Sequence, residues 1–365
     1  MPIGLGIVGY GGFGAFTADV YARMDEVRIV ALTDTDANRL AEGAQRYQAR
    51  AYPDLEHLLQ DPEVELVAIS TPPWLHVPQA LAAVEAGKHV FLEKPLATTL
   101  EDADRLLKRV REQGVRLSVD YVLRRIPIYR TLQKLIKSRL LGDIAFLRLE
   151  NVASNEALHA NHWFWDRARS GGIFIEHGVH FFDLGNQLCG VRPETVTAYA
   201  RNAVDGRQDR VLSAVSYENG VLASFYHAFD RPAILEQTVL RVGLDQGNVT
   251  VYGWIPEQMD VRGVLPEEQR GALATLLGTD LNVLNLPAPE GITGATAGQV
   301  VEATLTSTQR TADYQEAIRL GMADLVRSIL DPHYTPEVTL EDAYDSFRLA
   351  YLSQRSLETG QSLSF

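Results

Sequence analysis

The feature that most constrains this chain is a glycine-rich turn between an apolar strand and a helix near its start. Residues 9–14 read Gly-Tyr-Gly-Gly-Phe-Gly, which matches the pattern G-x-G-x-x-G. The first glycine permits a tight turn, the second lets backbone approach a pyrophosphate, and the third lets helix and strand pack closely. We expect the N–H groups near Gly12 and Phe13 to face phosphate groups at the helix start. The residues predicted to bind a dinucleotide here are Gly9, Gly11, Gly12, Phe13 and Gly14.

An acidic residue follows at the distance that this motif requires. Asp34 lies 20 residues after Gly14, at the end of the second expected strand. Its carboxylate could accept hydrogen bonds from both hydroxyls of an adenosine ribose, and it would repel a 2′-phosphate. No arginine or lysine lies at 33–38, and Arg39 falls inside the next expected helix. We therefore expect NAD as the cofactor rather than NADP. The alternative is a related fold that binds no dinucleotide, with Asp34 as a loop acid.

Short apolar runs alternate with helical patterns through the first third of the chain. The expected strands are residues 3–8, 28–33, 64–70, 89–92 and 115–119. The expected helices are residues 13–24, 37–47, 55–59, 78–85 and 100–112. The strands are rich in apolar and β-branched residues, as in a parallel sheet that is buried on both faces. The alternation predicts a doubly wound α/β sheet.

The pattern changes after about residue 124, where strands dominate. The expected strands are residues 144–152, 195–202, 211–217, 221–229, 238–242 and 248–254, and the expected helices are 131–138, 176–189, 314–329 and 340–359. Residues 286–298, rich in Pro, Gly, Ala and Thr, are expected to form a loop. We predict a Rossmann dinucleotide-binding domain over 1–123. A second α/β domain over 124–365 would contain a large, mainly antiparallel open sheet, with the last helix packing back on the first domain.

Composition excludes several classes of protein. The chain has 47 acidic and 34 basic residues, a net charge of −13, which argues against a nucleic-acid binder. The single cysteine, Cys189, rules out an internal disulfide framework and a cysteine-cluster zinc site. No apolar run approaches the roughly 20 residues of a membrane helix, and the first residues show no secretory signal. We expect a cytoplasmic protein without nucleic-acid or membrane partners.

Further segments extend the pattern to nearly the whole chain. They are residues 70–76 (Ser-Thr-Pro-Pro-Trp-Leu-His), 86–95 (Ala-Gly-Lys-His-Val-Phe-Leu-Glu-Lys-Pro), 171–183 (Gly-Gly-Ile-Phe-Ile-Glu-His-Gly-Val-His-Phe-Phe-Asp) and 354–360 (Gln-Arg-Ser-Leu-Glu-Thr-Gly). With the glycine-rich turn, they resemble the glucose–fructose oxidoreductase/inositol dehydrogenase/rhizopine-catabolism (Gfo/Idh/MocA) family. The resemblance implies a nicotinamide enzyme acting on sugars, polyols or related hydroxy compounds. It also implies an open sheet that packs against other subunits, so we expect a homodimer or homotetramer.

The resemblance also implies a catalytic trio. In the family pattern the lysine of Glu-Lys-Pro lies beside the nicotinamide and the substrate hydroxyl, which maps to Lys94. An acid and a histidine four residues apart complete the trio, which maps to Glu176 and His180. The acid is commonly aspartate, so Glu176 is a departure that lengthens the arm by one methylene. Other residues of these segments that we expect at the cofactor are Thr71, Pro72, His76 and Glu93.

The residue types suit hydride transfer, which requires removal of the proton of a carbinol. A histidine with a pKa near the working pH can accept that proton. Glu176, His180 and Asp183 have helical spacing that places them on one face, so the carboxylate could orient the imidazole and raise its basicity. Lys94 could stabilise the developing alkoxide. The structural alternatives are a core histidine at 180, a surface lysine at 94, and an Asp183 that braces its helix.

Several residues are candidates for contact with substrate. Trp163 and Trp165 could pack against the C–H faces of a sugar, or they could anchor a loop. Tyr121 and Arg124 follow the last expected strand of the first domain and could line a pocket. His177 could touch substrate or be structural. The clustered histidines, with Glu176, could in principle bind zinc, but their spacing matches no closed zinc motif, so we expect no metal. These histidines are His159, His162, His177 and His180.

The sequence thus predicts an NAD-dependent oxidoreductase that acts on a secondary alcohol of a sugar, inositol or related polyol. One alternative is an NAD-using glycosidase, in which a retained cofactor oxidises and then re-reduces the sugar. The other is a non-catalytic relative that senses nucleotide or ligand, against which Lys94 and His180 argue.

Overall fold

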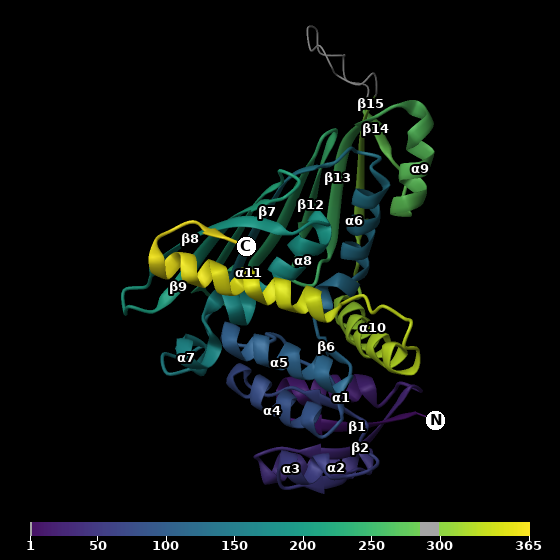
Figure 1. Ribbon diagram of the computed structural model, residues 1–365. Coiled ribbons are helices and arrows are strands. Elements are labelled where there is room, and N and C mark those ends of the chain that lie inside the picture. The colour runs from purple at the N-terminus through teal and green to yellow at the C-terminus, as the bar shows by residue number, and fades with distance from the viewer. Residues whose placement is uncertain (1, 285–298) are drawn as a thin grey trace. The chain divides into compact units, whose positions relative to one another are not determined.

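The computed structural model describes residues 2–284 and 299–365 of the chain (Figure 1). Contacts between residues divide it into two units. The first holds residues up to 122 together with 160–183 and 315–354, and the second holds 123–159, 184–314 and 355–365. The loop expected at 286–298 lies outside the described residues. The domain boundary between residues 123 and 124 stays a proposal.

The first unit is built on a six-stranded parallel sheet with the order β3-β2-β1-β4-β5-β6. The strands are β1 (Ile3–Val8), β2 (Val27–Thr33), β3 (Arg50–Tyr52), β4 (Leu66–Ile69), β5 (His89–Leu92) and β6 (Leu117–Val119). Every residue of β1 and β4 is buried, as a central parallel strand requires. This confirms the predicted doubly wound sheet. β3 was not among the predicted strands, because it is a three-residue edge strand whose residues are mostly exposed.

Helices connect these strands. They are α1 (Gly12–Tyr21), α2 (Ala37–Tyr47), α3 (Leu55–Leu59), α4 (Pro73–Glu85) and α5 (Leu100–Gln113). The expected helix at 78–85 begins five residues earlier, because Pro73 rather than Pro78 occupies the first turn. A proline is favourable there, since that turn has no intrahelical acceptor for its N–H groups. Pro78 lies inside the helix.

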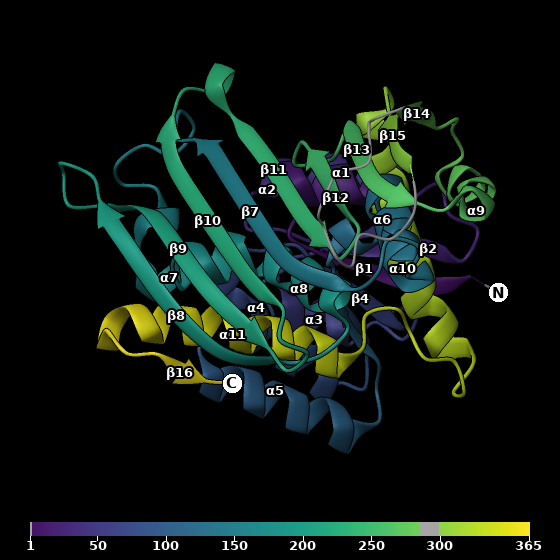
Figure 2. The ribbon, with the colours of Figure 1, turned by 90° about the horizontal axis from the view of Figure 1, so that it is seen from above.

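The second unit contains a ten-stranded sheet with the order β14-β15-β13-β12-β11-β7-β10-β9-β8-β16, and Figure 2 shows β8, β9, β10, β7 and β11 side by side. Only the β7–β10 pair is parallel among the described pairings, which confirms the mainly antiparallel sheet. The strands are β7 (Ile144–Ser154), β8 (Pro193–Asn202), β9 (Gln208–Tyr217), β10 (Leu222–Arg231), β11 (Gln237–Leu244), β12 (Gly247–Tyr252), β13 (Gln258–Leu265), β14 (Asn282–Leu284), β15 (Gln299–Thr306) and β16 (Leu363–Ser364). β13 was not among the predicted strands, although Met259 and Val261 alternate with polar residues there.

The remaining helices lie between residue 122 and the end of the chain. They are η1 (Val122–Arg125), α6 (Pro127–Ser138), η2 (Trp163–Trp165), α7 (Arg167–Ser170), η3 (Phe174–Gly178), α8 (Val179–Cys189), η4 (Ala233–Leu235), α9 (Glu267–Leu277), α10 (Arg310–Leu330) and α11 (Leu340–Thr359). The helix expected from residue 176 starts instead as a π-helical turn, η3, that continues into α8. In the described parts of the chain, no helix combines the length and the apolar character needed to cross a bilayer.

Candidate active site

The glycine-rich turn joins β1 to α1, and the packing around it requires glycine at two positions. Gly9 has a φ of +89°, and a Cβ there would lie 2.8 Å from the carbonyl oxygen of Ser70. A Cβ on Gly14 would lie 2.2 Å from the carbonyl oxygen of Gly9. A Cβ on Gly12, in contrast, would meet no atom within 4 Å. The turn is therefore tight where it meets the sheet and open on the side where a pyrophosphate would approach.

The start of α1 is suited to an anion. The helix begins at Gly12 with Gly11 as its N-cap, no side chain caps it, and no acidic residue lies in its first turn. The first N–H groups of a helix have no intrahelical partner and carry a partial positive charge. Phosphate oxygens would fit these donors, which include the N–H groups of Gly12 and Phe13.

Asp34 lies beside this turn, directly after β2. Its Oδ2 accepts a hydrogen bond from the N–H of Tyr10 at 2.6 Å, and its Oδ1 accepts one from the N–H of Asp36 at 2.7 Å. The carboxylate is half-buried and held in one orientation. Each carboxylate oxygen can accept more than one hydrogen bond, so Asp34 keeps capacity for the hydroxyls of a ribose. Together, the open turn, the helix start and this fixed acid fit a dinucleotide.

Arg39 lies closer to the glycine-rich turn than its place in the expected helix indicated. Arg39 does lie in α2, but in its first turn, where its N–H donates to the N-cap carboxylate of Asp36. Its Nη1 lies 3.8 Å from the position that a Cβ on Gly11 would occupy. A residue three positions after an N-cap stays close to the preceding loop, so its place in a helix did not put it out of reach. The sequence signal for this position was Asp36, a residue type that commonly caps a helix start and so places Arg39 in the first turn.

The structure brings Lys94 and Glu176 together across 82 residues of sequence. Lys94 follows β5 at the carboxyl edge of the parallel sheet, and the Lys94–Pro95 peptide bond is cis. Its Nζ donates to the Oε1 of Glu176 at 2.9 Å and to the backbone carbonyl of Glu176 at 3.0 Å. The two side chains are 19% and 13% exposed, so the ion pair is largely shielded from water.

The two histidines after Glu176 have lowered pKa values. Burial, and then the positive charge of Lys94, lowers the pKa of His177 to about 3. Burial, Lys94 and His177 together lower the pKa of His180 well below its ordinary value. His180 is therefore less basic than an ordinary histidine, contrary to the expected increase in its basicity. His177 and His180 are three residues apart, a spacing that makes residues neighbours on a helix.

Asp183 and Tyr121 both bond to α11. Asp183 is fully buried and accepts a hydrogen bond from the hydroxyl of Ser346 at 3.0 Å. Tyr121 is fully buried, and its hydroxyl donates to the carbonyl of Ala343 at 3.3 Å. The contact of Asp183 agrees with the alternative that it braces its helix. Arg124 is buried in η1 of the second unit. Contact of Tyr121 and Arg124 with substrate stays a prediction.

His76 links the segments that follow β4 and β5. Its Nδ1 lies 2.8 Å from the carbonyl oxygen of Pro95, and its Nε2 lies 2.8 Å from that of Thr71. Complete burial lowers the pKa of His76, and a neutral imidazole donates only one of these two hydrogen bonds. The ring therefore contacts backbone on both sides and fixes the loop next to Lys94. The other residues expected at the cofactor lie nearby: Thr71 donates to Gln79, and Pro72 is the N-cap of α4.

Glu93 is a buried acid directly before Lys94. Burial, and then the neighbouring carboxylate of Asp120, raises the pKa of Glu93 well above its ordinary value. The two residues follow the paired strands β5 and β6, so they come from adjacent strand ends. A protonated Glu93 could donate as well as accept a hydrogen bond.

Aromatic side chains gather in η2 and at the start of α4. The rings of Trp163 and Trp74 are 5.7 Å apart in an edge-to-face arrangement, and the guanidinium of Arg169 lies 5.3 Å from the ring of Trp74. Trp165 packs edge-to-face on the buried Phe164 at 5.0 Å. Both Trp163 and Trp165 are partly exposed. Trp74 was not among the predicted site residues, although the chain has only four tryptophans.

The histidines of this region do not gather with acids into a metal site. Within residues 2–284 and 299–365, no group of three or more His, Cys, Asp or Glu side chains is arranged to hold a metal ion.

Comparisons with known proteins agree with this geometry. Residues 3–121 match a family model described as "Oxidoreductase family, NAD-binding Rossmann fold". Residues 129–249 match a second model, described as "GFO/IDH/MocA C-terminal domain".

Individual relatives share about a third or less of their residues with this chain. 1,5-Anhydro-D-fructose reductase of Ensifer adhaerens is 32% identical over 206 residues, which cover 55% of this chain and 62% of that protein. The chain matches less than two thirds of the length of this and the next three curated relatives. scyllo-Inositol 2-dehydrogenase (NADP(+)) of Bacillus subtilis is 28% identical over 79% of this chain and 82% of its own length. A solved structure of levoglucosan dehydrogenase with NADH and levoglucosan shares the fold, with a TM-score of 0.81, 18% identity and coverage of 100% and 99% of the two chains.

Proposed function

We propose that this chain, which belongs to the Gfo/Idh/MocA oxidoreductase family, transfers hydride between the nicotinamide of NAD and a secondary alcohol of a sugar, inositol or related polyol. The observation that carries the proposal is the shielded Lys94–Glu176 ion pair at the carboxyl edge of the parallel sheet. Ligands of such sheets bind outside this edge. The names of the relatives refer to an anhydro sugar and to inositol, which are cyclic compounds with several hydroxyl groups.

Lys94 is proposed to bind the reacting oxygen. An ammonium group has three N–H donors, and two of them are directed to the carboxylate and the carbonyl of Glu176. The third is left for the oxygen of a substrate hydroxyl. Because the group is only 19% exposed, its charge is weakly screened and would stabilise an oxygen that becomes negative as its proton leaves. A bound nicotinamide would supply the hydride acceptor.

His180 is proposed to accept the hydroxyl proton. Its lowered pKa keeps the imidazole neutral at neutral pH, so the ring can receive a proton without first losing one. The same low pKa makes the proton acceptor weaker than an ordinary histidine. Transfer of the proton would therefore depend on hydride leaving the same carbinol in the same step.

The choice of NAD over NADP is proposed to come from Asp34. Its carboxylate would repel a 2′-phosphate, while Arg39, near Gly11, would attract one. Asp34 is held by two backbone N–H groups, whereas Arg39 is an exposed side chain whose Nε lies 3.8 Å from a carboxylate oxygen of Asp36. The fixed charge therefore supports a preference for NAD.

Exposed aromatic and apolar side chains support proposals for substrate contact and for assembly. We place one face of the sugar or polyol against Trp163, with Trp165 and His177 as further contacts, because partly exposed aromatic rings offer apolar surface for C–H groups. We also propose a homodimer or homotetramer. Large exposed apolar side chains on β7, β8 and β10 support this: Phe146, Tyr199 and Leu222.

The experiment is an assay of purified protein at 340 nm with NAD⁺ or NADP⁺ and a panel of inositols, sugars and anhydro sugars. We expect reduction of NAD⁺ by at least one of them, and loss of that activity in Lys94→Ala. Retention of NAD that does not exchange, with cleavage of a glycoside and no net reduction, would instead favour the glycosidase. Tight nucleotide binding without turnover of any compound would favour the sensing protein.

A further inference from the structure

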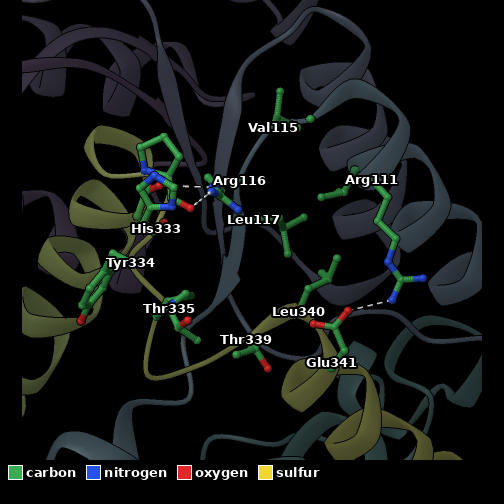
Figure 3. A pocket seen from close by; sticks show the side chains of 15 residues that line it. Arg111, Val115, Arg116, Leu117, His333, Tyr334, Thr335, Thr339, Leu340 and Glu341 are labelled. Carbon is green, nitrogen blue, oxygen red and sulfur yellow. Dashed lines mark hydrogen bonds and ion pairs between the residues drawn. The ribbon is translucent and has the colours of Figure 1, made fainter.

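A cavity of about 450 Å³ lies in the first unit, bounded by the end of α5, the start of β6 and the segment between α10 and α11 (Figure 3). Its size is in the range of small-molecule sites and exceeds that of an inorganic ion. Charged or polar side chains from all three elements line it: Arg111, Arg116, His333, Thr335, Thr339 and Glu341.

This cavity is separate from the active site. Leu117, the first residue of β6, lines the cavity, whereas Lys94 follows the last residue of the neighbouring strand β5. The strands of the sheet are parallel, so the cavity lies at its amino edge and Lys94 at its carboxyl edge. A ligand in the cavity would therefore not be the substrate or the nucleotide of the proposed reaction.

The wall formed by residues 331–338 is fixed by its own contacts. Asp324 on α10 accepts hydrogen bonds from the hydroxyl of Tyr334 at 2.7 Å and from the N–H of Glu337 at 2.9 Å. The guanidinium of Arg327 lies 4.1 Å from the ring of Tyr334. The cavity is thus formed without a ligand, so binding would not have to order this segment.

Arg116 places a positive charge at this cavity. Its Nε donates to the carbonyl of Ser328 at 3.2 Å, and its Nη2 donates to the carbonyl of Pro332 at 3.3 Å. Both acceptors are neutral. In the described part of the chain, no carboxylate lies within ion-pair distance of its guanidinium. This positive charge belongs to a chain with a net charge of −13.

Arg111 is the second cation of the cavity, and its present partner is replaceable. Figure 3 shows it facing Glu341, and its Nη2 lies 2.8 Å from the Oε1 of that residue. The two side chains are 59% and 66% exposed, and ion pairs with such exposure contribute little to stability. An incoming oxyanion could therefore take the place of Glu341 on Arg111.

We propose that this cavity binds a small polar metabolite through a carboxylate or phosphate group, held by Arg116 and Arg111. A guanidinium matches the planar carboxylate and the phosphate oxygens with paired N–H donors. Among the described residues that line the cavity, Glu341 is the only acid, and it would compete with the ligand for Arg111. The exposed hydroxyl of Thr335 and the imidazole of His333 would meet the rest of the ligand.

The test is calorimetric titration of the full chain with citrate as the carboxylate probe and inorganic phosphate as the phosphate probe, at constant ionic strength. We expect saturable binding of at least one probe. Arg111→Gln should weaken it about fivefold or more, and Glu341→Gln should strengthen it by a similar factor, because one removes a cation and the other removes the competitor. Both residues are exposed, so both variants should fold.

Arg105→Gln is the matched control. Arg105 also lies on α5 in an exposed ion pair, with Asp102, but it does not line the cavity. Arg105→Gln removes the same charge from the chain as Arg111→Gln does. The variant should bind each probe within about twofold of the unsubstituted chain, because the removed charge is exposed and lies outside the cavity lining. The relative affinities for citrate and phosphate identify which oxyanion the cavity prefers. Absence of saturable binding by the folded chain would overturn the proposal, as would binding that Arg111→Gln and Glu341→Gln leave unchanged.

Discussion

Replacement of Asp34 by serine should reverse part of the nucleotide preference. The carboxylate is a fixed negative charge beside the glycine-rich turn, because the N–H groups of Tyr10 and Asp36 hold its two oxygens at 2.6 and 2.7 Å. Serine keeps a short polar side chain but carries no charge. The substitution therefore removes the proposed ribose acceptor and the group that would repel a 2′-phosphate.

The expected magnitude comes from the hydrogen bonds that would be lost. A hydrogen bond to a charged group contributes about 1.5–3 kcal/mol, and 1.4 kcal/mol is a factor of ten in affinity. Loss of one ribose contact alone should thus weaken NADH binding by roughly tenfold or more. Binding of NADPH should strengthen, because the acid proposed to repel a 2′-phosphate is removed while the guanidinium of Arg39, 3.8 Å from the Cβ position of Gly11, remains to attract it. Arg39→Ala in the Asp34→Ser background should remove that gain.

Fluorescence titration with NADH and NADPH measures both effects. Asp36→Ser is the matched control, because it removes the same charge from the same loop, and serine can still cap α2. The control should bind NADH within about twofold of the unsubstituted chain, since exposed charges are screened. Unchanged NADH affinity in Asp34→Ser would refute the reasoning, and so would equal losses in the two serine variants.

Other expectations concern catalysis, pH and packing. His180→Ala should reduce turnover by about 10²–10⁴-fold, the usual contribution of general acid–base catalysis, and near-normal steady-state turnover would refute its role. Because the pKa of His180 is lowered, the rate of alcohol oxidation should show no fall centred on the ordinary histidine pKa of about 6.5 as the pH is lowered, and a step there would contradict the burial argument. His177 has a folded pKa of about 3, below its unfolded value, so its contribution to stability is present above the unfolded pKa and is lost as the pH falls towards the folded one. Urea unfolding between pH 7 and pH 5 should therefore show a loss of up to about 1.4 kcal/mol per pH unit that His177→Asn reduces. Gly14→Ala should destabilise the chain in thermal unfolding, because its Cβ would lie 2.2 Å from the carbonyl oxygen of Gly9, and an unchanged midpoint would contradict the tight turn.

The first sheet was predictable because its central strands are apolar on both faces. The short apolar run Ile3–Val8 is enough to predict a buried strand. The glycine-rich turn then marks where this strand ends and the first helix begins. The edge strand Arg50–Tyr52 carries no such signal, since an edge strand need not be apolar. The strand Gln258–Leu265 did carry one, in its alternation, and could have been found.

The contact between Lys94 and Glu176 could be expected from the family resemblance, whereas the electrostatics of the candidate site could not. The pairing of Lys94 with Glu176 spans 82 residues, and only the family resemblance, not spacing, placed them together. The π-helical turn Phe174–Gly178 has no evident sequence signal, and it changes the angular positions that were assigned to an ordinary helix. Burial of His177 and His180 depends on how the whole unit packs, so the lowered pKa of each could not be read from neighbouring residues in the sequence.

The ion pair of Lys94 and Glu176 influences the pKa values of the histidines around it. Lys94 is a shielded cation that contributes to lowering the pKa of His76, His177 and His180, and Glu176 is the anion that balances it. Substitution of Glu176 by glutamine would therefore do more than remove one hydrogen-bond acceptor. It would leave the charge of Lys94 without its counterion and lower the pKa of the nearby imidazoles further, because less negative potential would remain. The acid thus supports the proton acceptor indirectly, through the lysine, although its carboxylate is directed to Lys94.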